Sequence, residues 1–109
     1  MSARTYRVVV RGFFDGLDGG RRAALVARLA DHDLFASAFT EDGTLSYDEQ
    51  LSAFSHRVLV RVDAGPGEET DAATAGELSA LEALDRLGVS ARRLRVAVTS
   101  VDDVKVRRR

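Results

Sequence analysis

The sequence has no cysteine, no tryptophan, one proline and two histidines in 109 residues. Without cysteine, the chain forms no disulfide and carries no thiol nucleophile or thiolate metal site, which fits a reducing compartment. The two histidines, His32 and His56, and the scattered carboxylates make no metal-ligand spacing. We therefore expect no metal and no other cofactor.

Long apolar runs are absent as well. No stretch approaches the ~20 apolar residues that a membrane-spanning helix requires, and the N-terminal segment MSARTY leads into a strand without a signal-peptide core. The formal net charge of −1 gives no overall attraction to nucleic acid or to anionic lipid. The expectation is a cytoplasmic protein with no membrane contact.

The overall composition is typical of a globular protein, with 45% hydrophobic and 30% charged residues. A chain of this length has room for one domain, residues 1–109. Lys105 is the only lysine among sixteen basic residues. The arginine excess reflects either a GC-rich coding sequence or the use of guanidinium groups, at particular positions, for bidentate contacts with anions.

The clearest strand pattern is residues 5–14, TYRVVVRGFF, which the Asp15-Gly16 turn ends. Alternation gives this strand one apolar side, made of Tyr6, Val8 and Val10. It gives the other side a mixed set, made of Arg7, Val9, Arg11 and Phe13. Because both sides carry apolar residues, we interpret the segment as a central strand.

The rest of the chain alternates between helical and strand periodicity. Helices are predicted over residues 17–33, with Asp18 as N-cap, and from Thr70 or Asp71 to about Leu87, before Gly88. Strands are predicted over residues 44–48, 53–63 and 92–99, the last continuing through 101–106 past a bulge at Asp102 and Asp103. Residues 34–39 fit no pattern, and residues 107–109 read as a basic end.

The resulting order is strand, helix, strand, strand, helix, strand. It predicts an α+β protein with a ferredoxin-like βαββαβ fold, in which two helices cover one face of a four-stranded antiparallel sheet. The topology expected for this order places the first and third strands in the middle.

The sheet face away from the helices is where we expect function. It presents four arginines as candidate ligand-binding residues, Arg7, Arg11, Arg57 and Arg61, around an apolar strip, Val9, Phe13 and Leu59. We expect a homodimer that pairs through this strip and encloses a small anionic or polar ligand; the alternative is a solvated face on which arginine stems cover apolar ground. RNA binding is disfavoured, because the middle of the face lacks the aromatic residues that stack on bases.

Few residues are candidates for catalysis. His56 could act as a general base, with Tyr47 or Glu77 beside it, in a small cofactor-free enzyme; the structural alternative is a half-buried histidine at the rim of the core. Glu77 lies near the leucine stripe at 78, 81, 84 and 87, so it is either buried with a raised pKa or exposed where the helix overhangs the sheet. The glycines of GFFDGLDGG lack the spacing and the lysine of a phosphate loop, and no Gly-x-Ser-x-Gly motif occurs.

Four segments carry a resemblance: TYRVVVRGFFDGL, AFTEDGTLSYD, AFSHRVLV and DVKVRRR. Together they resemble a family of small uncharacterised actinobacterial proteins, a domain of unknown function, over nearly the whole chain. The resemblance implies a bacterial cytosolic origin and no particular activity. By inferred topology alone the chain also resembles dimeric α/β-barrel proteins, which include cofactor-independent monooxygenases and small-molecule binders.

Overall fold

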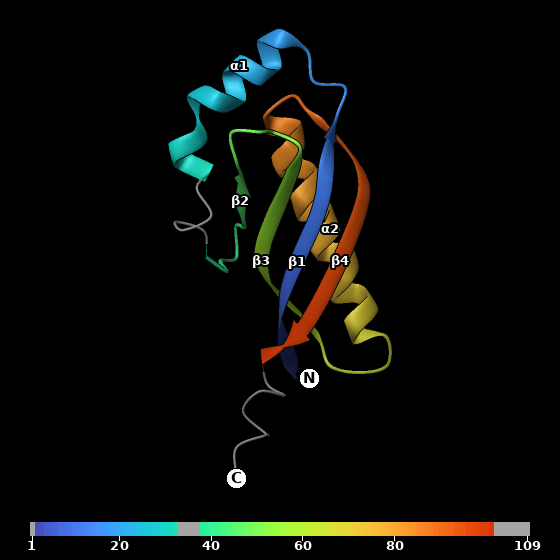
Figure 1. The fold of residues 1–109 in the computed structure, drawn as a ribbon. Coiled ribbons are helices and arrows are strands. Elements are labelled where there is room, and N and C mark those ends of the chain that lie inside the picture. The colour runs from blue at the N-terminus through green and yellow to red at the C-terminus, as the bar shows by residue number, and fades with distance from the viewer. Residues whose placement is uncertain (1, 33–37, 102–109) are drawn as a thin grey trace.

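The sheet is built around β1 (Ala3–Asp15), which pairs antiparallel with β3 (Ala53–Asp63) on one side and β4 (Ser90–Ser100) on the other (Figure 1). The short strand β2 (Thr44–Tyr47) pairs antiparallel with β3, so the sheet order is β2-β3-β1-β4. This computed structural model describes residues 2–32 and 38–101. The predicted α+β class, the antiparallel sheet and the central pairing of the first and third strands are confirmed.

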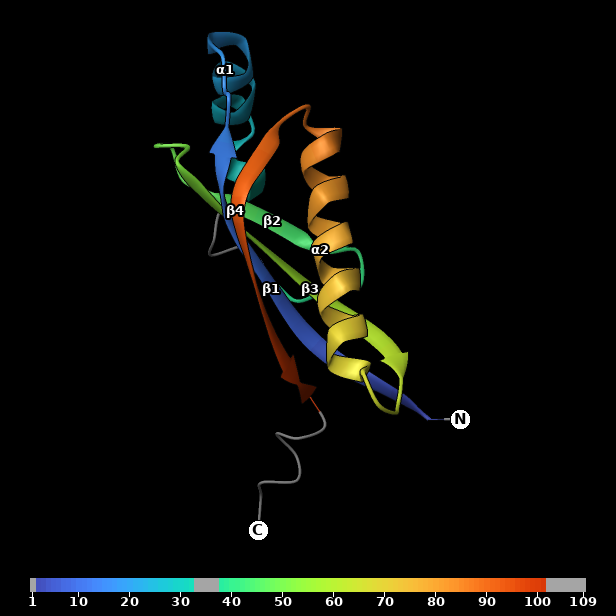
Figure 2. The same ribbon diagram turned by 90° about the vertical axis from the view of Figure 1, so that its right-hand side faces the viewer.

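The long helix α2 (Glu68–Arg86) lies on one side of this sheet (Figure 2). The side chains it buries are small along most of its length: Ala72, Gly76, Ala80 and finally Leu84. Ala72, Gly76 and Ala80 lie against an apolar strand face made of Tyr6, Val8, Val10, Val58 and Val60. The predicted leucine stripe is wrong in its first half, because Leu78 and Leu81 are 56% and 41% exposed.

Small residues are required because the helix axis approaches the sheet closely. A Cβ atom on Gly76 would lie 2.9 Å from the Cβ of Val8 and nearer still to its Cγ1 atom. A leucine at this position would push the helix off the strands. The leucines of α2 lie elsewhere: Leu84 packs in the apolar cluster at the end of the sheet, and Leu78 and Leu81 face solvent.

A polar cluster fastens the first turn of α2 to β1. The Tyr6 hydroxyl donates a short hydrogen bond to Glu68, whose other carboxylate oxygen accepts from the Gly65 N–H at 2.9 Å. The Nε atom of Arg4 lies 3.4 Å from the same carboxylate. The bond to Glu68 raises the pKa of Tyr6 to about 12 and lowers the pKa of Glu68.

The first helix, α1 (Gly19–Ala27), is shorter than predicted and lies beyond the upper end of the strands (Figures 1 and 2). Asp18 caps it as expected, since its Oδ1 atom accepts from the Arg21 N–H at 2.8 Å. A 3₁₀ turn, η1 (Leu29–His32), follows in place of the last predicted helical turn. The exact ferredoxin-like arrangement, with both helices over one sheet face, is therefore not matched.

The end of the sheet has its own apolar core. Leu25 is the only residue of α1 that is buried, and it packs in a second cluster with Phe14, Leu45, Tyr47, Leu51, Phe54, Leu84 and Val89. Within the described residues, neither α1 nor α2 combines the length and the hydropathy that a bilayer crossing requires. The predicted helix end at Asp33, residues 34–37 of the unassigned stretch, the strand continuation and bulge beyond Val101 and the basic end lie outside the described residues.

We predict that Gly76→Ala lowers the free energy of unfolding by up to about 2 kcal/mol. Alanine raises helix propensity by up to about 1 kcal/mol, but overpacking against a stiff β-branched side chain costs about 1–3 kcal/mol. Gly20→Ala in α1 is the matched control: its Cβ meets only Asp18 Oδ1, at 3.6 Å, so it should be neutral or stabilising. Urea unfolding of both variants measures this, and equal stabilisation by both would contradict the close approach.

Candidate functional site

The sheet face opposite α2, called the open face below, alternates guanidinium groups with apolar side chains. Register places Arg7 beside Leu59 and Val9 beside Arg57, so charge and apolar surface form a chequered pattern. Val9 and Leu59 are partly buried, whereas Phe13, near the end of β1, is 41% exposed. The structure therefore brings the predicted arginines and apolar strip onto one face.

This face is less bare than predicted, because Phe39 lies on it. The ring of Phe39 is 5.6 Å from the guanidinium carbon of Arg7 and 5.8 Å from that of Arg57, which are cation–π distances. The next residue joins the sheet, since the Leu59 N–H donates to the Thr40 carbonyl at 2.8 Å. Two of the four predicted ligand-binding arginines are thus already in contact with an aromatic ring.

The other two predicted arginines lie toward opposite ends of the face. Arg61 pairs in register with Thr5 and borders a small hollow together with Glu41, so a carboxylate is near it. Arg11 lies directly opposite Arg95 of β4. Both are exposed, and within the described residues neither has an ion pair or hydrogen bond. Like charges directly opposite one another destabilise a sheet, so this pair is the least compensated charge on the face.

A hollow of about 800 Å³ adjoins Arg11 at the upper end of the open face, between η1 and the strands; we call it the η1 hollow. Its wall is mainly apolar and includes Arg11, Leu29, Ala30, Ala53, Phe54 and Ser55. The Ser55 Oγ atom is buried and has no hydrogen-bond partner among the described residues. Sequence reasoning missed this hollow because η1 was predicted to be part of a longer helix.

His56 points to the other side of the sheet and is 1% exposed, under α2. Its Nε2 atom lies 2.9 Å from the Ser79 hydroxyl, while Nδ1 has no partner among the described residues. Burial, together with the positive charge of Arg86, lowers the pKa of His56 to about 4. His56 is therefore a neutral and weakly basic imidazole at neutral pH, which suits a packed residue better than a general base.

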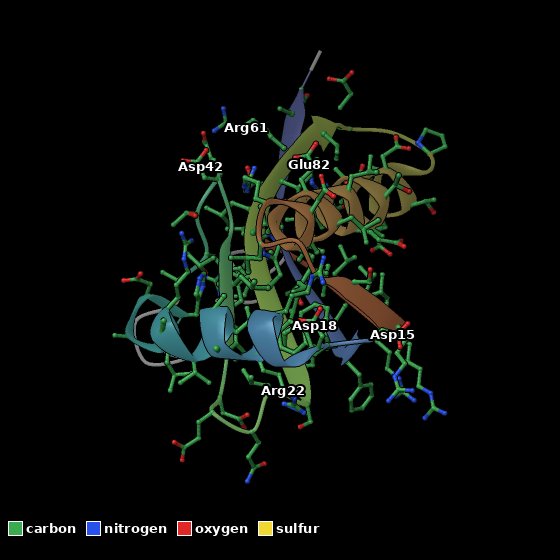
Figure 3. The ribbon with its side chains drawn as sticks, turned by 90° about the horizontal axis from the view of Figure 1, so that it is seen from above. Asp15, Asp18, Arg22, Asp42, Arg61 and Glu82 are labelled. Carbon is green, nitrogen blue, oxygen red and sulfur yellow. The ribbon has the colours of Figure 1, made fainter. Side chains whose placement is uncertain are left out.

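The imidazole of His56 has space beneath α2 because residue 43 is glycine. A Cβ atom on Gly43 would lie 2.6 Å from Cε1 of His56, and the backbone there has a φ of 86°, a conformation that glycine adopts without strain. Ser79 lines a hollow that Asp42 and Glu82 border from the loop before β2 and from α2 (Figure 3). The Glu41-Asp42-Gly43 turn was visible in the sequence, but the role of Ser79 carried no sequence signal.

The other catalytic candidates do not join His56. The Tyr47 hydroxyl donates to the Leu25 carbonyl at 2.7 Å, and its ring stacks on His32, so it fastens β2 to α1. Burial raises the pKa of Tyr47. Glu77 is partly exposed on α2, and in the described part of the chain no hydrogen bond links it to His56. Over these same residues no cluster of side chains suits a metal ion.

Comparison with known proteins gives one match. A family model described as a family of unknown function (DUF6204) matches residues 1–109. No curated protein and no solved structure matches the chain.

We predict that stability falls as the pH drops from about 6.5 to about 4, in part because of His56. In the unfolded chain the imidazole takes up its proton near pH 6.5, whereas in the folded protein it does so only near pH 4, so protons favour unfolding between these values. The loss is about 3 kcal/mol in this range, and above it the imidazole is neutral in both states.

Urea unfolding at pH 7, 5.5 and 4 checks this. His56→Leu should lose that component of the pH dependence, while Ser79→Ala should retain it, because the imidazole stays buried. Parallel stability curves for the wild type and His56→Leu would show that burial of His56 is not the cause.

Proposed function

The chain belongs to the family of unknown function whose model spans residues 1–109, and we propose that it binds a small anionic ligand on its open face and that two copies pair through this face. The cytoplasmic location and bacterial origin stay predictions from the sequence.

The observation that carries the proposal is the cross-strand pair of Arg11 and Arg95. Two exposed guanidinium groups lie directly opposite each other, and neither has a carboxylate partner among the described residues. A bound anion bridges such a pair, replaces repulsion with charge-assisted hydrogen bonds, and takes advantage of the bidentate geometry of arginine.

Pairing of two copies follows from the apolar part of the same face. Val9, Leu59 and the exposed Phe13 provide apolar surface that water covers in a monomer. Two unliganded faces would bring arginines toward arginines, and anions held between them remove this repulsion. A sheet-against-sheet dimer, like that of dimeric α/β barrels, would thus be completed around its ligand. In this proposal Arg11 is the principal ligand contact, Arg57 and Arg7 lie farther along the face, and Arg61 lies toward its other end.

The alternative of a cofactor-free enzyme that uses His56 has weaker support. The imidazole is buried on the α2 side, away from the arginines, and its pKa is well below the range in which a base works at neutral pH. RNA binding also has less support, because Val9, Arg57 and Leu59 occupy the strand positions where RNA-binding sheets carry aromatic side chains. The Phe39 ring does lie on this face, but it is already in contact with the guanidinium groups of Arg7 and Arg57.

We predict that pyrophosphate binds the wild type and that Arg11→Gln or Arg95→Gln weakens this binding by about tenfold or more. This is the change in affinity expected from the loss of one charge-assisted hydrogen bond. Isothermal titration calorimetry at low ionic strength measures the affinity. Arg22→Gln, on α1 (Figure 3), is the matched control and should leave it unchanged. Equal weakening by all three variants would mean that the protein attracts pyrophosphate only through its overall charge.

We also predict that replacing Val9 and Leu59 together by aspartate converts dimers into monomers, because two carboxylates would have to lose water in the interface. Light scattering coupled to gel filtration reports the mass. Leu78→Asp with Leu81→Asp, on the exposed side of α2, is the control and should leave the dimer intact. Monomers in the control and not in the test variant would place the interface on α2 instead.

A further inference from the structure

The η1 hollow lies next to the proposed anion site and shares one residue with it. Arg11 lines this hollow, and its cross-strand neighbour is Arg95. We propose that the ligand is an amphiphilic carboxylic acid, with its acid group on Arg11 and Arg95 and its apolar body in the η1 hollow. This inference rests on the proposed function and adds the chemical class of the ligand.

The apolar body is inferred from the wall of the hollow. Leu29 and Ala30 of η1 form one side, and Ala53 and Phe54 at the start of β3 form another. A volume of about 800 Å³ is in the range of about 300–1,000 Å³ that small-molecule sites have. An ion as small as acetate would leave most of this apolar wall in contact with water, whereas a ring system or a short alkyl chain would cover it.

The polar groups of the hollow indicate how such a ligand is oriented. Ser55 points to the open face and its buried hydroxyl lacks a partner among the described residues, so a ligand oxygen would satisfy it. Two carboxylates also line the hollow, Asp48 and Glu49. Asp48 Oδ1 is engaged in the turn, where it accepts from the N–H groups of Gln50 and Leu51 at 3.1 and 3.3 Å.

The negative charge of Glu49 allows the orientation of the ligand to be tested by measuring binding affinity. Its charge opposes a carboxylate in the hollow, whereas Arg11 attracts one, so the acid group should lie at the Arg11 end. Replacing Glu49 by glutamine should therefore strengthen binding of an acid, and Arg11→Gln should weaken it.

The test uses 2-naphthoate as probe, with acetate as the anion without an apolar body and 2-naphthylmethanol as the neutral analogue, each titrated calorimetrically into the full-length protein. We expect 2-naphthoate to bind at least about tenfold more tightly than either control, since burying the ring system and pairing the acid each contribute more than 1.4 kcal/mol. Ala53→Phe, which places a ring in the hollow, should reduce 2-naphthoate binding to the level of acetate. Ala23→Phe is the matched control: Ala23 is exposed on α1, away from the open face, and does not line the hollow.

The outcomes separate this inference from the proposed function. If 2-naphthoate binds no better than acetate, or Ala53→Phe binds it as well as Ala23→Phe does, the hollow does not hold the ligand, even where Arg11→Gln still weakens pyrophosphate binding. If 2-naphthylmethanol binds as well as 2-naphthoate and Arg11→Gln changes neither, the hollow binds neutral molecules and the anion proposal is wrong. A loss of 2-naphthoate binding in Arg11→Gln and in Ala53→Phe, with a gain in Glu49→Gln, supports both.

Discussion

The short distance between α2 and β1 determines which side chains can pack on each side of the sheet. Gly76 lies against Val8, and Ala72 and Ala80, one turn to either side, keep the helix axis close to the strands. A helix this close leaves space for only one layer of side chains, so the central strands turn valines and a tyrosine toward it. The same closeness buries His56 beneath Ser79 and keeps its imidazole neutral.

The close contact also explains why the two sides of the sheet differ in chemistry. Alternation along β1 and β3 gives every residue that faces α2 a neighbour that faces away, and these neighbours include Arg7, Arg11, Arg57 and Arg61. Because α1 lies beyond the strand ends and α2 lies on the opposite side, neither of these helices covers the middle of that side (Figure 2). The ring of Phe39 does lie on that side, within cation–π distance of the guanidinium groups of Arg7 and Arg57.

Alternation in the sequence was sufficient to predict the four strands, their central pair and the face on which each residue lies, because period-two patterns directly encode a half-buried sheet. The helix interface was predicted poorly. By hydrophobicity, the leucines at 78 and 81 suggest that they form the buried stripe of the helix. The buried stripe consists instead of residues small enough to fit against Val8, and the sequence alone does not give that distance. Phe39, Ser55 and Ser79 were missed for a related reason: each owes its position to a segment distant in sequence.

The outer edge of β4 has a consequence for how copies of this chain meet. Among the described strands β4 is hydrogen-bonded to β1 only, so its other edge presents backbone groups on which a further strand could assemble. Arg92, Arg93 and Arg95 cluster at one end of this edge, and Arg93 has a φ of 57°, which breaks the extended line of the backbone. Repulsion between these arginines and the local kink obstruct edge-to-edge polymerisation, so the strand resists growth into fibrils while the broad surface of the sheet remains accessible.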